Sequence, residues 1–290
     1  MKIVDAFAFF DEIDLLKIRL KTLAPVVDIF LISEFSTSFS GKPKAYNLEN
    51  HLSDFSEFSH KIKYIKQNQD TILSPFENDH YQKDSLKVYL MDMLESEDVL
   101  LFGDVDEVPK PQAVVDASMA ISRGRKICHF AQTMSYSYLN MIDRSETLLS
   151  YCGEYPEISR KKWLGTIATT REHLNEYSMT ELRDPLQKQF GKRIGDGGWH
   201  FSYSGGYNRE AVSRVKNKIE NNAHQEFNTV EILSKVEERL KSKEDILGRT
   251  SKKRFRRTGP KFHIVPIDST FPIEVQLNRS RYEHLIHDYN

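Results

Sequence analysis

The sequence predicts an α/β fold in which helices flank a central, mostly parallel β-sheet. The first half of the chain alternates between apolar, β-prone segments and segments with helical periodicity, which is the pattern of such folds. Residues 99–102 (VLLF) are short and fully apolar, as expected for a strand at the buried centre of the sheet. With 290 residues, the chain can bury a sizeable core in one large domain, or in one domain with a smaller appendage.

The first half of the chain gives the clearest elements. Residues 2–10 form the first predicted strand, and Asp11 is the expected N-terminal cap of the helix that follows. Residues 26–33 and 61–66 are predicted as the second and third strands, and residues 79–94 as a helix. Ligands of such sheets gather at the carboxyl ends of the strands, so the polar residues after each strand are the first candidates for a site.

The second half of the chain is less regular. It contains no internal repeat and shows no sharp domain boundary. The expected elements are a strand at 127–138, glycine-rich turns at 195–206, helices at 208–223 and 229–245, and a basic segment with an extended tail.

Composition excludes several classes of protein. Hydrophobic residues at 39% and charged residues at 29% are typical of a folded chain, and the formal net charge of −1 predicts no nucleic-acid partner. The start of the chain lacks a signal peptide, and its most apolar early stretch is too short to span a bilayer. Cys128 and Cys152 make neither a disulfide framework nor a zinc site. We therefore expect a cytoplasmic protein without a transmembrane segment.

The sharpest local signal follows the apolar strand at 99–102. Asp104, Asp106 and Glu107 lie in a turn that ends at Pro109, a residue expected to stop regular strand pairing. Carboxylates packed so closely repel one another unless a cation neutralises them, and oxygen ligands select hard ions such as Mn²⁺ or Mg²⁺. Such an ion could bridge a diphosphate. An acidic surface turn, or a metal-dependent nuclease or phosphohydrolase, would fit the same pattern.

A second cluster lies at 195–206, where glycines surround Asp196, Trp199 and His200. Aromatic faces beside hydrogen-bonding groups suit sugar rings. The alternative is that Trp199 belongs to the core and His200 is structural.

A third cluster spans 218–228 and holds His224, Glu226 and Asn228, which by themselves indicate a helix end with polar caps. The basic run at 249–257 could clamp phosphates or contact nucleic acid, although a solvated mobile loop is the default interpretation.

Taken together and in this order, the segments resemble the family 17 glycosyltransferases. The resemblance spans nearly the whole chain, and the ordered set is more specific than any single motif. The matching segments are 7–20 (FAFFDEIDLLKIRL), 27–30 (VDIF), Glu34, 39–43 (FSGKP), 81–84 (YQKD), 104–109 (DVDEVP), 198–203 (GWHFSY), 224–226 (HQE), 266–268 (PID), Pro272, Asn278 and Tyr282.

The resemblance implies a GT-A-type nucleotide-sugar-binding fold. Residues 1–228 would form the catalytic domain, and residues 229–290 a C-terminal helix, basic loop and tail packed on it. The implied donor is UDP-N-acetylglucosamine, with inversion at the anomeric carbon and a carbohydrate or glycoconjugate as acceptor. Animal members carry a membrane anchor and modify N-glycans in the Golgi. Because this chain shows no anchor, we expect a bacterial or viral enzyme acting on a surface polysaccharide, a lipid-linked glycan or a glycoprotein.

An inverting displacement needs a base for the acceptor hydroxyl and a cation for the departing diphosphate. Asp196 is the favoured base, with Glu226 and Glu107 as rivals. Asp106 is expected to hold Mn²⁺ or Mg²⁺, with Asp104 and His200 as further ligands. The expected donor-binding residues are Phe10, Asp11, Glu34, Gln82, Lys83, Asp84, Asp104, Trp199 and His200.

Two other functions remain open at this point. A metal-dependent phosphodiesterase would be expected to need a second cluster of carboxylates or histidines, and none is evident. A catalytically inactive protein that binds carbohydrates or nucleotide sugars is the alternative from a different class.

Overall fold

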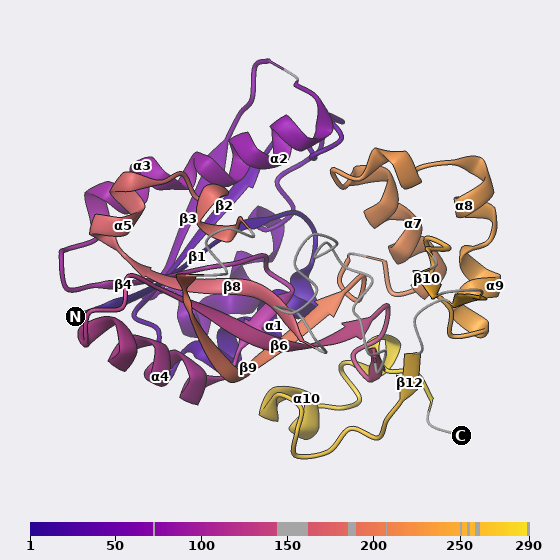
Figure 1. Ribbon diagram of the computed structural model, residues 1–290. Coiled ribbons are helices and arrows are strands. Elements are labelled where there is room, and N and C mark those ends of the chain that lie inside the picture. The colour runs from indigo at the N-terminus through magenta and orange to yellow at the C-terminus, as the bar shows by residue number, and fades with distance from the viewer. Residues whose placement is uncertain are drawn as a thin grey trace.

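The computed structural model describes residues 1–71, 73–143, 162–184, 190–206, 208–249, 251–253, 256–258 and 262–288. Within this part of the chain, one ten-stranded sheet forms the centre of the molecule, and helices cover both of its faces (Figure 1). The predicted α/β fold class is therefore confirmed. No helix in these ranges is long and apolar enough to cross a membrane.

Four parallel strands form one half of the sheet. Their order is β3 (Ile62–Gln67), β2 (Ile29–Phe35), β1 (Ile3–Phe9) and β4 (Val99–Phe102). Side chains of β1 alternate between the two faces, as the period of a strand requires. Phe7 therefore packs in one hydrophobic cluster and Ala6 in the other.

Helices cover the two faces of this half. The cluster with Phe7 includes α1 (Ile13–Leu23) and α4 (Pro111–Ser122), whereas the cluster with Ala6 includes α3 (Leu86–Met93) and α5 (Arg171–Glu176). These two helix layers bury the central strands from both sides, which explains why 99–102 is apolar throughout.

The other half of the sheet is largely antiparallel. It contains β8 (Trp163–Thr170) beside β4, then β6 (Ile127–Tyr136), β7 (Met141–Asp143) and β12 (Phe262–Ile264). Strand β9 (Lys192–Ser202) pairs parallel to β6, and the short β5 (Glu107–Pro109) pairs antiparallel to β9.

The C-terminal elements form a lobe beside the sheet (Figure 1). The hydrophobic core of this lobe contains residues of α7 (Ala211–Asn221) and of α9 (Val236–Lys241). These two helices lie on either side of residue 228, where the sequence predicted a domain boundary. That boundary stays a prediction. The remaining short elements are η1 (Glu49–Phe58), η2 (Glu181–Arg183), η3 (Gln225–Phe227), α8 (Val230–Ser234), β10 (Ser251–Lys253), β11 (Arg256–Thr258), α10 (Ile273–Leu277) and η4 (Glu283–Leu285).

Several predicted boundaries are wrong. The helix predicted at 79–94 is two helices, α2 (Pro75–Asp84) and α3, which meet at Ser85. Helix α2 begins early because Ser74 and Glu77 form a capping box ahead of its first turn. The single helix predicted at 229–245 is also two, α8 and α9.

Two expectations about caps and turns also fail. The N-cap of α1 is Glu12 rather than Asp11, and it makes no side-chain capping bond. Most of the glycine-rich segment at 195–206 is strand rather than turn, because β9 continues to Ser202. By contrast, Pro109 is the last residue of β5 and lies opposite Gly198, so strand pairing ends at this proline as expected.

A fully buried ion pair lies under the loop between β4 and β5. Arg19 on α1 binds both oxygens of Asp5 on β1, at 2.7 and 2.6 Å. Its guanidinium also donates to the backbone carbonyls of Asp104 and Glu107, at 2.9 and 2.6 Å. Arg19 thereby ties the first strand and the first helix to the acidic loop.

We predict that Arg19→Met lowers the free energy of unfolding by about 3–5 kcal/mol, because it leaves the Asp5 carboxylate buried without a partner. The double variant Asp5→Val/Arg19→Met should recover part of this loss, but the two loop carbonyls still lose their donor. Urea denaturation of the three proteins measures the effect. A single variant as stable as the wild type would show that the pair does not hold the loop.

Candidate functional site

A cleft of about 680 Å³ opens at the carboxyl ends of β1 and β4. This is the edge of the sheet where the sequence predicted a site. Of the predicted site residues, the cleft is lined by Phe10, Gln82, Lys83, Asp104, Asp106, His200 and Glu226. Side chains that the sequence analysis did not select also line it, among them Lys44, Phe76, Trp163, Arg183 and Lys218. Arg249, the first residue of the basic run that could clamp phosphates, lines the cleft as well.

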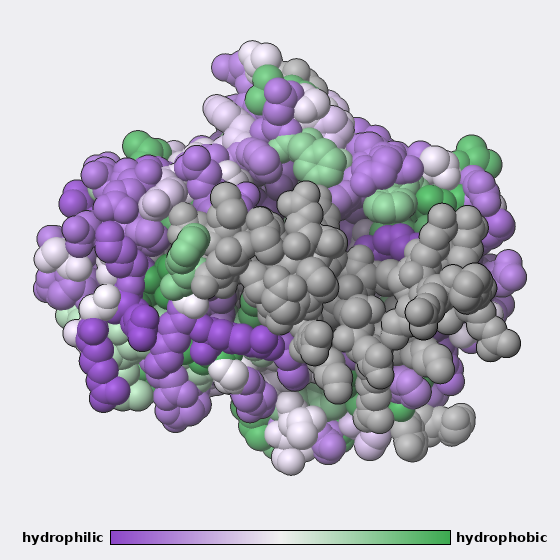
Figure 2. All heavy atoms as spheres, in the orientation of Figure 1, coloured by the Kyte–Doolittle hydropathy of each residue, from purple (hydrophilic) through white to green (hydrophobic). Residues whose placement is uncertain are grey.

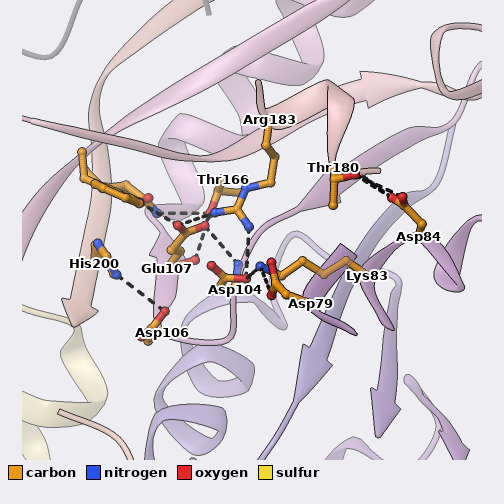
Figure 3. A network of polar contacts seen from close by, with 12 residues as sticks. Asp79, Lys83, Asp84, Asp104, Asp106, Glu107, Thr166, Thr180, Arg183 and His200 are labelled. Carbon is orange, nitrogen blue, oxygen red and sulfur yellow. Dashed lines mark hydrogen bonds and ion pairs between the residues drawn. The ribbon is translucent and has the colours of Figure 1, made fainter. Parts of the chain in front are cut away.

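Asp104 sits between two cations on one wall of the cleft (Figure 3). Its Oδ1 atom lies 3.0 Å from Nη1 of Arg183 and 3.1 Å from Nζ of Lys83. Burial on its own would raise the pKa of Asp104, but Arg183 and Lys83 hold it well below its usual range. This carboxylate is therefore ionised and already paired through Oδ1.

Glu107 is fully buried behind this wall and does not line the cleft. Its Oε1 atom accepts hydrogen bonds of 2.6 Å from Nη2 of Arg183 and from Nε1 of Trp163, and its Oε2 atom accepts one of 3.0 Å from the backbone N–H of Asp104. A β-carbon added at Gly165 would come within 2.1 Å of Oε1, so only glycine leaves room for this carboxylate. Glu107 positions the wall rather than facing a substrate.

Asp106 points into the cleft from the opposite side of the same loop (Figure 3). Its Oδ2 atom lies 2.8 Å from Nζ of Lys218 on α7, and its Oδ1 atom lies 3.7 Å from Nε2 of His200 on β9. Burial alone would lower the pKa of Lys218, but Asp106 and Glu12 raise it above the ordinary lysine value. Within the described part of the chain, the buried Nδ1 atom of His200 has no hydrogen-bond partner.

Helix α2 carries Lys83 and the η2 turn carries Arg183, and a contact between these two elements holds the two cations in the same wall of the cleft. Asp84, at the end of α2, accepts hydrogen bonds from the backbone N–H and the hydroxyl of Thr180. This contact, visible in Figure 3, fixes the turn that carries Arg183 next to Lys83. Asp84 thus supports the wall and does not line the cleft. Gln82 lines the cleft and hydrogen-bonds the backbone carbonyl of Thr37.

Two residues expected to bind the donor support the cleft from behind. Glu34 is fully buried and accepts hydrogen bonds from Lys44 and from the backbone N–H of Asn47. Asn47 in turn donates to the carbonyl of Phe10, so this carboxylate orders the loop that flanks the cleft. Asp11 accepts a hydrogen bond from Asn217 on α7 and joins the C-terminal lobe to the end of β1.

Trp199 and Asp196 lie outside the residues that line the cleft. The Trp199 ring packs beside Phe201 in a separate core cluster, and its Nε1 atom donates to the backbone carbonyl of Thr270. Because side chains alternate along a strand, Trp199 and His200 face opposite ways. Asp196 has a 74% exposed side chain and pairs with Lys110 at 2.7 Å.

Glu226 is the predicted base that does line the cleft. It belongs to the η3 turn, and its Oε1 atom lies 2.7 Å from Nδ1 of His224. Its side chain is 53% exposed, so the carboxylate is open to a ligand. Among the described ranges, no group of three or more His, Cys, Asp or Glu side chains is placed to hold a metal ion.

Comparison with known families decides the identity of this site. The sequence pattern of Glycosyltransferase family 17 matches residues 1–241. The chain belongs to glycosyltransferase family 17. The enzyme is therefore a glycosyltransferase. A search of curated proteins gave no match.

Two of the solved structures similar to this glycosyltransferase share little sequence identity with it. One is a 4-diphosphocytidyl-2C-methyl-D-erythritol synthase from Anaerococcus prevotii, with 9% identity, a TM-score of 0.42, and coverage of 74% of this chain and 96% of that one. Another is a putative glucose-1-phosphate thymidylyltransferase from Bacillus anthracis, with 10% identity, a TM-score of 0.42, and coverage of 67% and 86%.

Among the cleft side chains that sequence reasoning missed, Trp163, Arg183 and Lys218 contact the carboxylates of the acidic turn. None lies in a motif, because each joins the site through the fold from a distant segment. Only Lys218 left a signal, since it occurs in the polar run at 218–228 and on the predicted helix before it.

We predict that Gly165→Ala destabilises the enzyme by about 1–3 kcal/mol, because the new methyl group displaces the Glu107 carboxylate from Trp163 and Arg183. The matched control is Gly195→Ala, where an added β-carbon meets no atom within 4 Å. Thermal unfolding of both variants measures the difference. Equal stability of the two would show that the space around Glu107 is not tight.

Proposed function

We propose that this enzyme transfers N-acetylglucosamine from UDP-N-acetylglucosamine to a hydroxyl group of a glycan or glycoconjugate, with inversion and with the help of Mn²⁺ or Mg²⁺. The observation that carries the proposal is the meeting of Asp106 and His200 with the cations Lys83 and Arg183 in one cleft. Such a site can hold a diphosphate and stabilise the charge that develops on it as it leaves.

The charges of the cleft favour a diphosphate that arrives with a metal ion. Among the residues that the structure describes, five lysine and arginine side chains line it, and five aspartate and glutamate side chains balance them. A diphosphate adds negative charge to this neutral lining, so a divalent cation would restore the balance. The basic residues in this count are Lys44, Lys83, Arg183, Lys218 and Arg249, and the acidic residues are Glu12, Asp79, Asp104, Asp106 and Glu226.

The residues present fit such an ion. Asp106 Oδ1 and His200 Nε2 face each other at 3.7 Å, too far apart for a hydrogen bond, and both residues are buried. Mg²⁺ in particular is commonly held by one or two protein carboxylates together with substrate phosphates and water. When bound, the ion would supply positive charge to the leaving diphosphate. We assign it to Asp106 and His200, because Oδ1 of Asp104 already binds two cations.

The nucleoside would lie beyond Asp104, toward the ends of β1 and β2. Phe10 and Phe39 line this part of the cleft together with Lys44, whose ammonium group is held by Glu34. Glu34 and Asp11 would thus act on the donor through the residues that they position. Asp104, with Oδ1 paired, would contribute its other oxygen to the donor.

Glu226 is the base in this proposal. It lines the cleft, and His224 orients its carboxylate. A general base must reach the proton of the acceptor hydroxyl, and neither Asp196 nor Glu107 lines the cleft. The base role expected for Asp196 therefore passes to Glu226.

We predict that UDP with Mn²⁺ raises the melting temperature, and that UDP in a chelator does not. Ligand at 100 times its dissociation constant should add about 2.7 kcal/mol. Asp106→Asn should abolish this metal-dependent shift, because it removes the charge and keeps the shape. The matched control is Asp92→Asn, the same change at an exposed position of α3. Metal-dependent stabilisation that survives in Asp106→Asn would refute the assignment of Asp106.

We predict further that Glu226→Gln cuts sugar transfer by about 10²–10⁴-fold. UDP and Mn²⁺ should still stabilise this variant, because the base handles only the proton of the acceptor. Asp196→Asn serves as the control and should transfer sugar at a near-normal rate. UDP release from UDP-N-acetylglucosamine in the presence of acceptor measures the rate. An inactive Asp196→Asn beside an active Glu226→Gln would reverse the assignment.

A further inference from the structure

One end of the cleft carries three aromatic side chains, of which the chemistry above uses only the Nδ1 atom of His224. Phe76 on α2, His224 ahead of η3 and Phe227 within η3 all line it. Phe76 is 40% exposed, and the His224 side chain is 32% exposed. An exposed phenylalanine inside a cleft that also holds many charged side chains indicates a surface that a ligand covers.

The two sides of the cleft contact each other through the rings of Phe76 and His224. The rings of Phe76 and His224 lie 4.9 Å apart with their planes at 90°. A perpendicular contact covers only one face of one ring, so the pair still offers aromatic surface to a ligand. Figure 1 shows α2 on one side and the lobe of α7 and α8 on the other, and Figure 2 shows the molecular outline notched between these two regions.

Helix α2 sets the distance between this aromatic end and the charged centre. Phe76, Asp79 and Lys83 lie at helical spacing on the face that lines the cleft. Lys83 lies seven positions after Phe76, which corresponds to about 10 Å along the helix axis. The aromatic end therefore lies beyond the place proposed for the diphosphate and leaves room for a sugar ring between them.

The aromatic end also carries hydrogen-bonding groups. Glu226 lies beside the rings, because its Oε1 atom is 2.7 Å from Nδ1 of His224. His80 lines the same cleft from α2. An apolar ring face next to an exposed carboxylate matches a pyranose, which has an apolar face of C–H groups and a rim of hydroxyls. An acyl chain would offer no hydrogen bond to the exposed carboxylate of Glu226 or to His80.

We propose that Phe76 and His224 form the binding platform for the acceptor sugar, which is a pyranose ring. This inference rests on the proposed function, since it places the acceptor next to the proposed base. The ring would pack on Phe76 while Glu226 accepts the proton of the reacting hydroxyl. The platform would thus select acceptors that end in a pyranose over those that offer a hydroxyl of serine or threonine.

The test is ligand-observed saturation-transfer NMR with methyl glycosides of glucose, galactose and mannose, in the presence of UDP and Mn²⁺. At least one of these glycosides should bind the wild-type enzyme. Phe76→Ala should bind it about tenfold more weakly, as loss of one stacking contact implies. Phe76→Trp, which keeps an aromatic face, should retain the affinity. Val88→Ala, which removes an exposed apolar side chain from α3, is the control and should bind like the wild type.

The metal-dependent stabilisation by UDP, measured on the same proteins, separates the two proposals. If Phe76→Ala keeps this stabilisation and loses the glycoside, the platform is supported. If it binds the glycoside as tightly as the wild type, or if no glycoside binds the wild type, the platform is overturned while the donor site stands. If UDP stabilises none of the proteins but glycoside binding still depends on Phe76, the proposed function fails and the sugar platform remains.

Discussion

The buried guanidinium of Arg19 is the contact on which the geometry of the cleft depends. It neutralises Asp5 inside the sheet and holds the backbone carbonyls at both ends of the turn from Asp104 to Glu107. A buried charge pair with satisfied hydrogen bonds tolerates little movement, because any displacement leaves a charge uncompensated. The turn can therefore present Asp104 and Asp106 to the cleft without depending on a ligand to order it.

The carboxylates of this turn lie in two different environments. Glu107 is turned inward, where Trp163 and Arg183 satisfy its oxygens, whereas Asp106 is turned toward His200 and Lys218. Arg183 connects the two regions because it binds both Glu107 and Asp104. Glu107, Arg183 and Asp104 therefore form a row of paired charges along one wall of the cleft. Beside this wall, Oδ1 of Asp106 faces the imidazole of His200. We propose this oxygen as a ligand of the cation that would accompany a diphosphate.

The sequence was informative wherever function depends on contiguous residues. Strand β4 and the acidic turn after it were predicted from the apolar run and the carboxylates, and both lie at the site. Trp199 was misread because a glycine-rich segment was taken for turns. In the strand that it forms, neighbouring side chains must face opposite sides, so His200 lines the cleft and Trp199 joins the core.

The sequence was uninformative wherever the site depends on long-range contacts. Trp163 and Arg183 reach the cleft from β8 and η2, elements that carry no motif and were not predicted. Glu34 and Asp84 were selected as polar residues close to strand and helix ends. In the structure, both carboxylates accept hydrogen bonds from backbone N–H groups and hold neighbouring segments in place. Whether a carboxylate binds a ligand or a backbone amide is decided by elements distant in sequence, which local patterns do not encode.

The most direct test of the account is a crystal structure of the enzyme with UDP and Mn²⁺. The account predicts Mn²⁺ bound to Asp106 and His200, with the diphosphate between them and the pair formed by Lys83 and Arg183. The uridine should lie toward Phe10, and the end of the cleft near Phe76 should stay open for the acceptor. A nucleotide bound away from this cleft, or a metal ion held without Asp106, would contradict it.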